Sequence, residues 1–139
     1  MRFDDEVADP LSDEMQSKVL ESFSRKLKAV EAVCIQDYNK GMLSPTLCRE
    51  AVRLARAAGK KVLIDPWPMS DYSKYQGATL ITPNRREASM AVGFEVEDSS
   101  TARKAAGKLR DMLKLDAVVI TLDKEGAWLK CDTDDELVP

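Results

Sequence analysis

Apolar residues recur along this 139-residue chain with two different spacings, and the spacing separates strands from helices. Short runs that are almost continuously apolar predict strands at 32–36 (AVCIQ), 61–65 (KVLID), 78–82 (ATLIT) and 117–121 (AVVIT). Another run, 127–131 (AWLKC), follows the turn LDKEG and predicts a strand that returns antiparallel. Between these runs, apolar residues recur at intervals of three and four, which predicts helices.

Capping residues set the boundaries of the first two predicted helices. Ser12 is a favoured N-cap, and the acidic residues after it suit the positive end of a helix. Ser44 caps the next helix, Pro45 occupies its first turn and Gly59 ends it. The faces expected to be buried are Met15, Val19, Leu20, Phe23, Leu27 and Val30 in the first, and Leu47, Ala51, Leu54, Ala55 and Ala58 in the second.

Two more helices are predicted after the third strand. A short one runs from Arg85 to about Val92 and ends at Gly93. The other begins near Ser99 or Ser100. Its expected buried face consists of Ala102, Ala105, Ala106, Leu109 and Leu113.

This alternation of strands and helices predicts an α/β fold with a mainly parallel, Rossmann-like sheet. We expect three layers, with helices on both faces of the sheet, because the continuous run 117–121 suits a strand that is buried on both sides. The length suits a single domain over residues 1–139, and residues 132–139 (DTDDELVP) are expected to form a frayed, acidic and solvated tail.

Composition excludes several classes of protein. The net charge is −3, so no overall basic field favours nucleic acid, and no apolar run approaches the ~20 residues of a membrane helix. The acidic start MRFDDEVADP is not a secretory signal. The chain has no histidine, which excludes histidine bases and most zinc sites. Three unpaired cysteines, Cys34, Cys48 and Cys131, indicate packing thiols in a reducing cytoplasm.

The residues that follow the strands are the candidates for a site, because parallel sheets bind ligands beyond the carboxyl ends of their strands. Asp37 and Lys40 follow the first strand and either form a plain turn or hold a phosphorylated ligand. Asp65 precedes a proline, so it either begins a turn or holds magnesium through water. There is no G-x-G-x-x-G and no Walker A motif, so a nucleotide needs another kind of loop.

Two further candidates also have a simpler structural interpretation. Asn84 and Glu87 have the spacing of a capping box, and the same helix start could attract phosphate while Glu87 brings magnesium. Thr121 to Gly126 (TLDKEG) is either a hairpin or a turn that borders a nucleotide. Trp128 and Trp67 are interpreted as packing residues, although Trp67 lies in a loop where it could flank a ligand.

The order of four segments is more specific than any one of them. CIQDYNKGML, GKKVLIDP, YQGATLITPNRREA and VVITLDKEGAWL together resemble the ribokinase-like, or phosphofructokinase-B, family of carbohydrate kinases. The D-Y-x-K-G loop and the Y-x-G-A-T-L-x-T-P-N-x-x-E block resemble the kinase domain of the heptose-7-phosphate kinase/ADP-heptose synthase proteins. The resemblance runs from Arg2 to about Cys131.

The resemblance implies phosphoryl transfer from MgATP to the anomeric hydroxyl of a heptose 7-phosphate, on the route to ADP-heptose and lipopolysaccharide. Glu87 corresponds to the residue that organises magnesium. The positions expected near the sugar phosphate and the transferred phosphate are Asp37, Lys40, Asp65 and Asn84. The positions expected to border the nucleotide are Thr121 and Gly126. A cytoplasmic protein with sugar phosphate and ATP as its partners follows from the same resemblance.

This sequence departs from the family pattern in ways that bear on activity. Kinases of the family are longer, and their G-A-G-D segment, which supplies the anion hole and the base, is absent here. Trp67 and Pro68 follow D-P where the subfamily has a lysine or similar polar residue, which puts phosphate contacts in that loop in doubt. We therefore expect a natural or artificial fragment, the central portion of a kinase, that is inactive as an isolated chain and contains no catalytic base.

Two alternatives stay open. The chain is either a non-catalytic module that binds nucleotide or sugar phosphate, or an interaction protein that dimerises through exposed sheet edges. A kinase of the same family with a different sugar acceptor is the remaining possibility.

Overall fold

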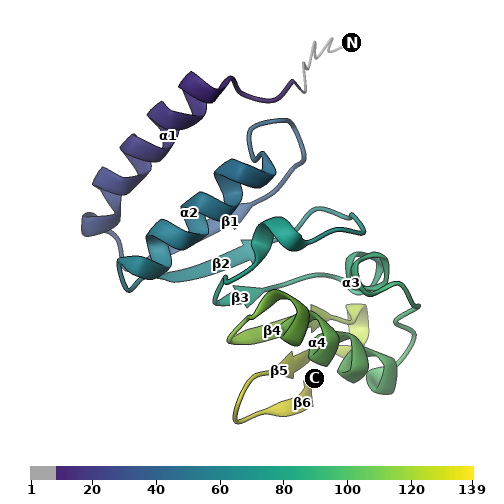
Figure 1. Cartoon of the computed structure of the whole chain (residues 1–139). Helices are drawn as coiled ribbons and strands as arrows, with labels where there is room; N and C mark the ends of the chain where they lie inside the picture. The colour runs from purple at the N-terminus through teal and green to yellow at the C-terminus, as the bar shows by residue number, and fades with distance from the viewer. Residues whose placement is uncertain (1–8) are drawn as a thin grey trace, which may run out of the picture.

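The computed structural model describes residues 9–139, in which a mixed sheet is flanked by helices (Figure 1). The resemblance from Arg2 onward therefore begins outside the described residues. The strands lie side by side in the order of the sequence: β1 (Ala32–Gln36), β2 (Lys61–Asp65), β3 (Leu80–Ile81), β4 (Ala117–Thr121), β5 (Ala127–Lys130) and β6 (Asp135–Val138). β1 to β4 are parallel, whereas β5 and β6 are antiparallel to their neighbours.

The first three helices begin at the predicted caps, and the fourth begins at Ser99, one of its two predicted starts. They are α1 (Asp13–Lys26), α2 (Pro45–Ala57), α3 (Arg85–Val92) and α4 (Ser99–Leu113), with 3-10 turns η1 (Leu27–Ala29), η2 (Ser73–Tyr75) and η3 (Asp123–Glu125). The side chains of Ser12, Ser44 and Asn84 accept hydrogen bonds from backbone amides in the first turn of the first three helices. Asp98 does the same for α4. The mainly parallel α/β sheet predicted from the sequence is confirmed.

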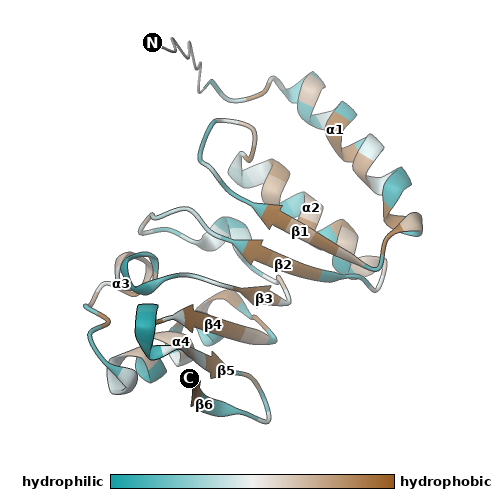
Figure 2. Ribbon diagram, turned by 180° about the vertical axis from the view of Figure 1, so that it is seen from behind, coloured by the Kyte–Doolittle hydropathy of each residue, from teal (hydrophilic) through white to brown (hydrophobic). Residues whose placement is uncertain are grey.

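The crossover helices α2 and α4 pack on one face of this sheet, and α1 lies beside α2. Each parallel crossover leads to the next strand in the same direction, and right-handed crossovers of this kind place every connecting helix on the same side. In Figure 2 the strands accordingly lie in front of α2 and α4, which Figure 1 shows from the other side. The sequence predicts helices on both faces, whereas residues 9–139 supply them for one face.

Two neighbouring rows of residues show the difference between the faces. Ile35, Ile64, Ile81 and Val118 lie in register across β1 to β4, and all are buried under the helices. The row beside it points to the opposite face and contains no buried residue: Cys34, Leu63, Leu80 and Ala117. We call this second surface the open face. Leu129 and Val119 lie on it as well.

The open face corrects two expectations from the sequence. β4 is buried on one side only, since Val118 and Ile120 are enclosed and Val119 between them is not. Cys34 is exposed and Cys131 is partly exposed, so only Cys48 is a buried packing thiol. Burial raises the pKa of the Cys48 thiol to about 11, so it stays protonated at neutral pH.

α1 also differs from its prediction. The helix forms, but none of its residues is fully buried, and Met15 is 46% exposed. The reason is its position beside α2 at the edge of the sheet, where Phe23 is only partly buried against the core. Leu27, which follows the helix, is buried.

Residues 132–139 are not the frayed tail expected from their acidity. Residues 135–138 form strand β6, which pairs with β5. Asp135 holds the strand in place, because its carboxylate accepts hydrogen bonds from Trp128 (3.0 Å), Lys130 (3.0 Å) and Arg103 (2.8 Å). Three donors from the sheet and α4 offset the cost of fixing an acidic segment.

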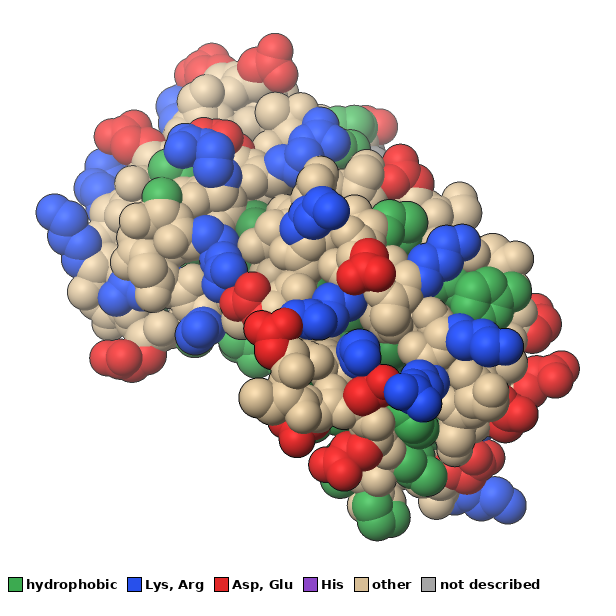
Figure 3. Space-filling model, turned by 60° about the horizontal axis from the view of Figure 1, so that its bottom comes forward, with side chains coloured by type: hydrophobic (Ala, Val, Ile, Leu, Met, Phe, Trp, Pro, Cys, Tyr) green, Lys and Arg blue, Asp and Glu red, His purple; other side chains and the backbone are tan. Residues whose placement is uncertain are grey.

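The surface in Figure 3 carries basic and acidic side chains that are interspersed over the face shown. On that face they do not form the continuous basic stripe that marks a nucleic-acid surface. None of the described helices combines the length and apolar character needed to cross a bilayer.

Candidate functional site

The residues that follow the four parallel strands meet at one edge of the sheet. The Asp37 amide donates to the Asp65 carbonyl (3.0 Å), which joins the ends of β1 and β2. The Thr121 amide donates to the Pro83 carbonyl (3.0 Å), and Asn84 forms an isolated parallel bridge with Thr121. The groups predicted from the sequence are therefore neighbours along the carboxyl edge, in the order of their strands.

Asn84 and Glu87 form a capping box at the start of α3. The Glu87 amide donates to Asn84 Oδ1 (2.9 Å), and the Asn84 amide donates to Glu87 Oε2 (2.8 Å). Asn84 is exposed and Glu87 is half-buried, so the helix start faces the carboxyl edge while it is capped. The second carboxylate oxygen of Glu87 stays outside the box.

The TLDKEG segment forms a hairpin with a tight turn at η3. The Leu122 amide donates to the Gly126 carbonyl (2.8 Å), which closes the turn. Gly126 has φ 99°, and a Cβ atom there would lie 2.1 Å from the Val138 carbonyl oxygen. Only glycine fits, because β6 passes directly beside it.

Arg85, which sequence reasoning missed, ties this turn to α3. Its guanidinium pairs with Asp123 (3.1 Å) and Glu125 (2.8 Å), and it also donates to the carbonyls of Glu97 (2.7 Å) and Val96 (3.3 Å). The side chain is only 20% exposed. Arginine at the first position of a helix carries no sequence signal for such a role, because its partners lie far along the chain.

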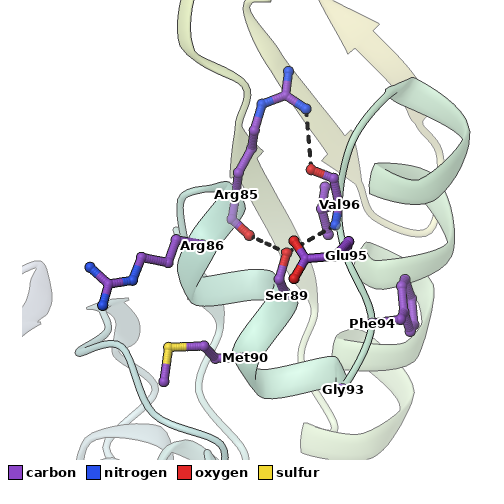
Figure 4. Close-up of a pocket in the computed structure, with 8 residues that line it drawn as sticks. All are labelled: Arg85, Arg86, Ser89, Met90, Gly93, Phe94, Glu95 and Val96. Atoms are coloured by element: carbon purple, nitrogen blue, oxygen red, sulfur yellow. Dashed lines mark hydrogen bonds between the residues drawn. The ribbon is translucent and has the colours of Figure 1, made fainter.

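Figure 4 shows Arg85 turned from α3 toward Val96 at the border of a cavity of about 630 Å³. Ser89 braces this wall, since its hydroxyl donates to the Arg85 carbonyl (2.8 Å) and accepts from the Val96 amide (2.9 Å). The predicted site residues do not line this cavity, so it lies beside the carboxyl-edge site.

Asp37 lies inside the protein rather than at its surface. Its side chain is 1% exposed and pairs with Lys74, while Tyr75 donates a hydrogen bond to the same oxygen. Burial raises the pKa of Asp37, but the hydrogen bonds from Lys74, Tyr75 and the Asn39 amide outweigh it and hold the pKa below 3.8. The carboxylate acts on the loop after β1, and Lys74 and Tyr75 are two more residues that sequence reasoning missed.

Lys40 and Asp65 are both exposed at the same edge. Lys40 lies on the loop 37–43, against a small cavity of about 170 Å³ that the loop itself encloses. Asp65 accepts a hydrogen bond from the Gln36 side chain (3.2 Å). Trp67 is 37% exposed, and its amide donates to the Tyr75 hydroxyl (3.3 Å), so the loop after β2 is held from within.

The Tyr72 hydroxyl lies in the field of three carboxylates at this edge. Burial raises the pKa of its hydroxyl, and the negative charges of Glu87, Asp37 and Asp65 raise it further. The hydroxyl oxygen is buried and makes no hydrogen bond within the described chain. Glu87 and Asp65 each offer a carboxylate near Tyr72, and carboxylate oxygens are the ligand type that Mg²⁺ takes. The described residues contain no cluster of three or more acidic or thiol ligands.

Comparison with known proteins identifies the family. The model of the pfkB family carbohydrate kinases matches residues 5–139. The bifunctional protein HldE of Wolinella succinogenes is 39% identical over 126 residues, which cover 91% of this chain and 26% of that protein. HldE of Campylobacter fetus subsp. fetus is 45% identical over 111 residues, covering 80% of this chain and 24% of that protein. The chain therefore spans about a quarter of the length of these relatives.

Solved structures agree on the fold. A point mutant of phosphofructokinase-2 from Escherichia coli superimposes with a TM-score of 0.75 at 19% identity, over 93% of this chain and 43% of that chain. The ribokinase of Arabidopsis thaliana complexed with ribose and ATP superimposes with a TM-score of 0.67 at 18% identity, over 94% of this chain and 39% of that chain. Because the family model matches almost the whole length of this chain, the chain belongs to the pfkB family of carbohydrate kinases.

Proposed function

We propose that this chain forms the part of a sugar kinase that binds ATP, magnesium and the phosphorylated sugar. The observation that carries the proposal is the contact between the start of α3 and the TLDKEG turn, where Asn84 bridges to Thr121. A capped helix start beside a turn at the carboxyl edge is suited to bind phosphate. ATP and sugar phosphates are cytoplasmic metabolites, so we place the protein in the cytoplasm.

Each predicted residue has a distinct role in this proposal. Bound MgATP supplies the phosphoryl group and metal charge that offsets the charge of the phosphates. Glu87 and Asp65 hold the cation through water, and the amides at the start of α3 bind phosphate beside Asn84. Lys40 would neutralise phosphate charge, and Thr121 and Gly126 would border the nucleotide. Asp37 sets the path of the loop that carries Lys40.

We further propose heptose 7-phosphate as the sugar, with its anomeric hydroxyl as the acceptor, in the synthesis of ADP-heptose for lipopolysaccharide. The support is the resemblance of the D-Y-x-K-G loop and the T-P-N-x-x-E block, together with the identity of 39–45% to HldE proteins. A different sugar acceptor within the family is the alternative. The G-A-G-D segment is absent from these 139 residues, so we expect no turnover from this chain alone.

Calorimetric titration of the full chain with MgATP tests the binding proposal. We expect the wild type to bind MgATP. In Asn84→Ala/Glu87→Ala the affinity should fall at least about tenfold, which corresponds to a loss of about 1.4 kcal/mol in binding free energy. Asp98→Ala is the matched control, because it removes the other capping box, at the start of α4. An equal loss in the control, or no binding by the wild type, would contradict the proposal.

A non-catalytic, dimerising module is a second candidate, and the open face favours it. Apolar side chains on that face lie next to one another without a helix over them in the described chain. Calorimetry with MgATP separates the candidates, because neither is expected to turn over as an isolated chain. Binding of MgATP would favour the kinase part, whereas a dimer that binds no MgATP favours the module.

A further inference from the structure

A buried ionic cluster lies beneath the loop 37–43, and Asp37 is the one member of it that the sequence singled out. Lys74 Nζ lies 2.5 Å from Asp37 Oδ2, with the two side chains 8% and 1% exposed. The Tyr75 hydroxyl donates to the same oxygen (2.5 Å), and the Asn39 amide donates to Oδ1 (2.8 Å). We call Asp37, Lys74 and Tyr75 the Asp37 cluster.

The Asp37 cluster joins the loop after β1 to the connection between β2 and β3, since Tyr75 lies 38 residues beyond Asp37. Lys74 Nζ also donates to the Leu43 carbonyl (3.3 Å), so one ammonium holds both ends of the loop 37–43. The Tyr75 hydroxyl accepts a hydrogen bond from the Trp67 amide (3.3 Å), which attaches the loop after β2 to the cluster. The turn η2 therefore fixes the two loops that follow β1 and β2.

Stability alone does not explain a cluster of this kind. Removing two charges from water costs free energy, and well-packed apolar residues in place of a buried ion pair are often neutral or stabilising. Apolar residues cannot replace the directionality of the hydrogen bonds, because each hydrogen bond here fixes one atom of the loop. The loop needs such restraint, since Asn39 has φ 51° and Gly41 has φ 83°, which a free chain seldom adopts together.

We propose that Lys74 and Tyr75 are positioning residues that hold the loop 37–43 in the shape that binds a phosphorylated sugar. A cavity of about 570 Å³ adjoins the loop, and Asn39, Gly41 and Lys74 all line it. The ligand class rests on the proposed function, whereas the positioning role rests on the cluster itself. Lys74 acts through the loop, because its side chain is 8% exposed and its ammonium is held by Asp37 and the Leu43 carbonyl.

Hydrogen exchange of the full chain tests the positioning role without any ligand. The main variant is Asp37→Asn/Lys74→Met, which removes both charges and leaves neither unpaired. We expect its free energy of unfolding to change little, while the amides of residues 38–43 exchange at least about tenfold faster. Tyr75→Phe should have a smaller effect on the same amides. The single variant Lys74→Arg keeps the positive charge, so these amides should exchange as slowly as in the wild type. Lys108→Met is the control, because Lys108 also holds a carbonyl, that of Val92, away from this loop.

Binding of heptose 7-phosphate and of MgATP, measured on the same variants, tests the ligand class. We expect a selective loss of sugar phosphate affinity, about tenfold or more, with MgATP affinity unchanged. Unchanged exchange at 38–43, or faster exchange spread evenly over the chain, would overturn the positioning role. If the wild type binds neither ligand, the proposed function fails, and the exchange result still decides the role of Lys74 and Tyr75.

Discussion

Asp37 illustrates how one side chain can be predicted at the right place with a different role. Its position after the first strand marks it as a ligand-binding candidate, and the structure places it at the carboxyl edge. Its carboxylate, however, is enclosed by Lys74, Tyr75 and the Asn39 amide. Spacing along a sequence predicts where a residue lies, but the partners of a buried charge come from other segments and leave no local signal.

The pKa of Asp37 leads to a prediction for stability. The folded pKa is lower than the unfolded value, so the carboxylate stabilises the fold at pH values above about 4 and this contribution is lost as pH falls through the folded pKa. Asp37→Asn leaves Lys74 buried and unpaired, so we expect it to cost about 3 kcal/mol at pH 7.

Urea denaturation between pH 2 and pH 7 measures this effect. The difference between wild type and Asp37→Asn should shrink as the pH falls below about 4, because the wild-type carboxyl is then protonated as well. Asp37→Asn/Lys74→Met should cost less than the single change. A difference that stays constant with pH would argue against the charged pair.

At the scale of elements, boundaries were predictable wherever a cap or glycine marks them. The strands β1, β2 and β4 and the helix α3 have the predicted bounds. β3 is shorter than predicted, at 80–81 instead of 78–82. The acidity of residues 132–139 hid strand β6, because charge patterns do not show that Asp135 will find three donors.

Gly126 provides a prediction for the β5–β6 pair. Gly126→Ala would place a methyl group 2.1 Å from the Val138 carbonyl at φ 99°, so β6 must shift. We expect a loss of about 1–3 kcal/mol in the free energy of unfolding, measured by urea denaturation.

Gly107→Ala is the matched control, because Gly107 lies within α4 and a Cβ there meets nothing within 4 Å. This control should stabilise the protein by about 1 kcal/mol, since alanine favours a helix over glycine. If both variants changed stability in the same direction, the contact between Gly126 and β6 would not be the reason for the glycine.

At the scale of the whole molecule, the fold class was predictable and the coverage of the sheet was not. Apolar runs predict a parallel sheet, but the side on which each crossover helix lies depends on the spatial order of the strands. Because the order here equals the order in the sequence, the crossover helices α2 and α4 share one face. The continuous apolar run 117–121 is typical of a strand whose side chains are buried on both faces of the sheet.

The open face predicts self-association of the isolated chain. We expect light scattering to show a dimer at micromolar concentrations, and Leu63→Lys/Val119→Lys to give a folded monomer. Met112→Lys, an equal change on the helix side, is the control and should leave the dimer intact. The rate of maleimide labelling at Cys34 should fall as the dimer forms. A monomer at all concentrations would exclude this mode of association.

The strand order also bears on how the chain acquires its structure. Each strand pairs with the strand that follows it in the sequence, so within the described chain each pairing needs only the next crossover or hairpin to be complete. The parallel pairs close long crossovers, which form more slowly than the hairpins that join β4, β5 and β6. During synthesis, β1 and β2 can pair before β4 has left the ribosome, so the sheet can grow one strand at a time from its N-terminal edge.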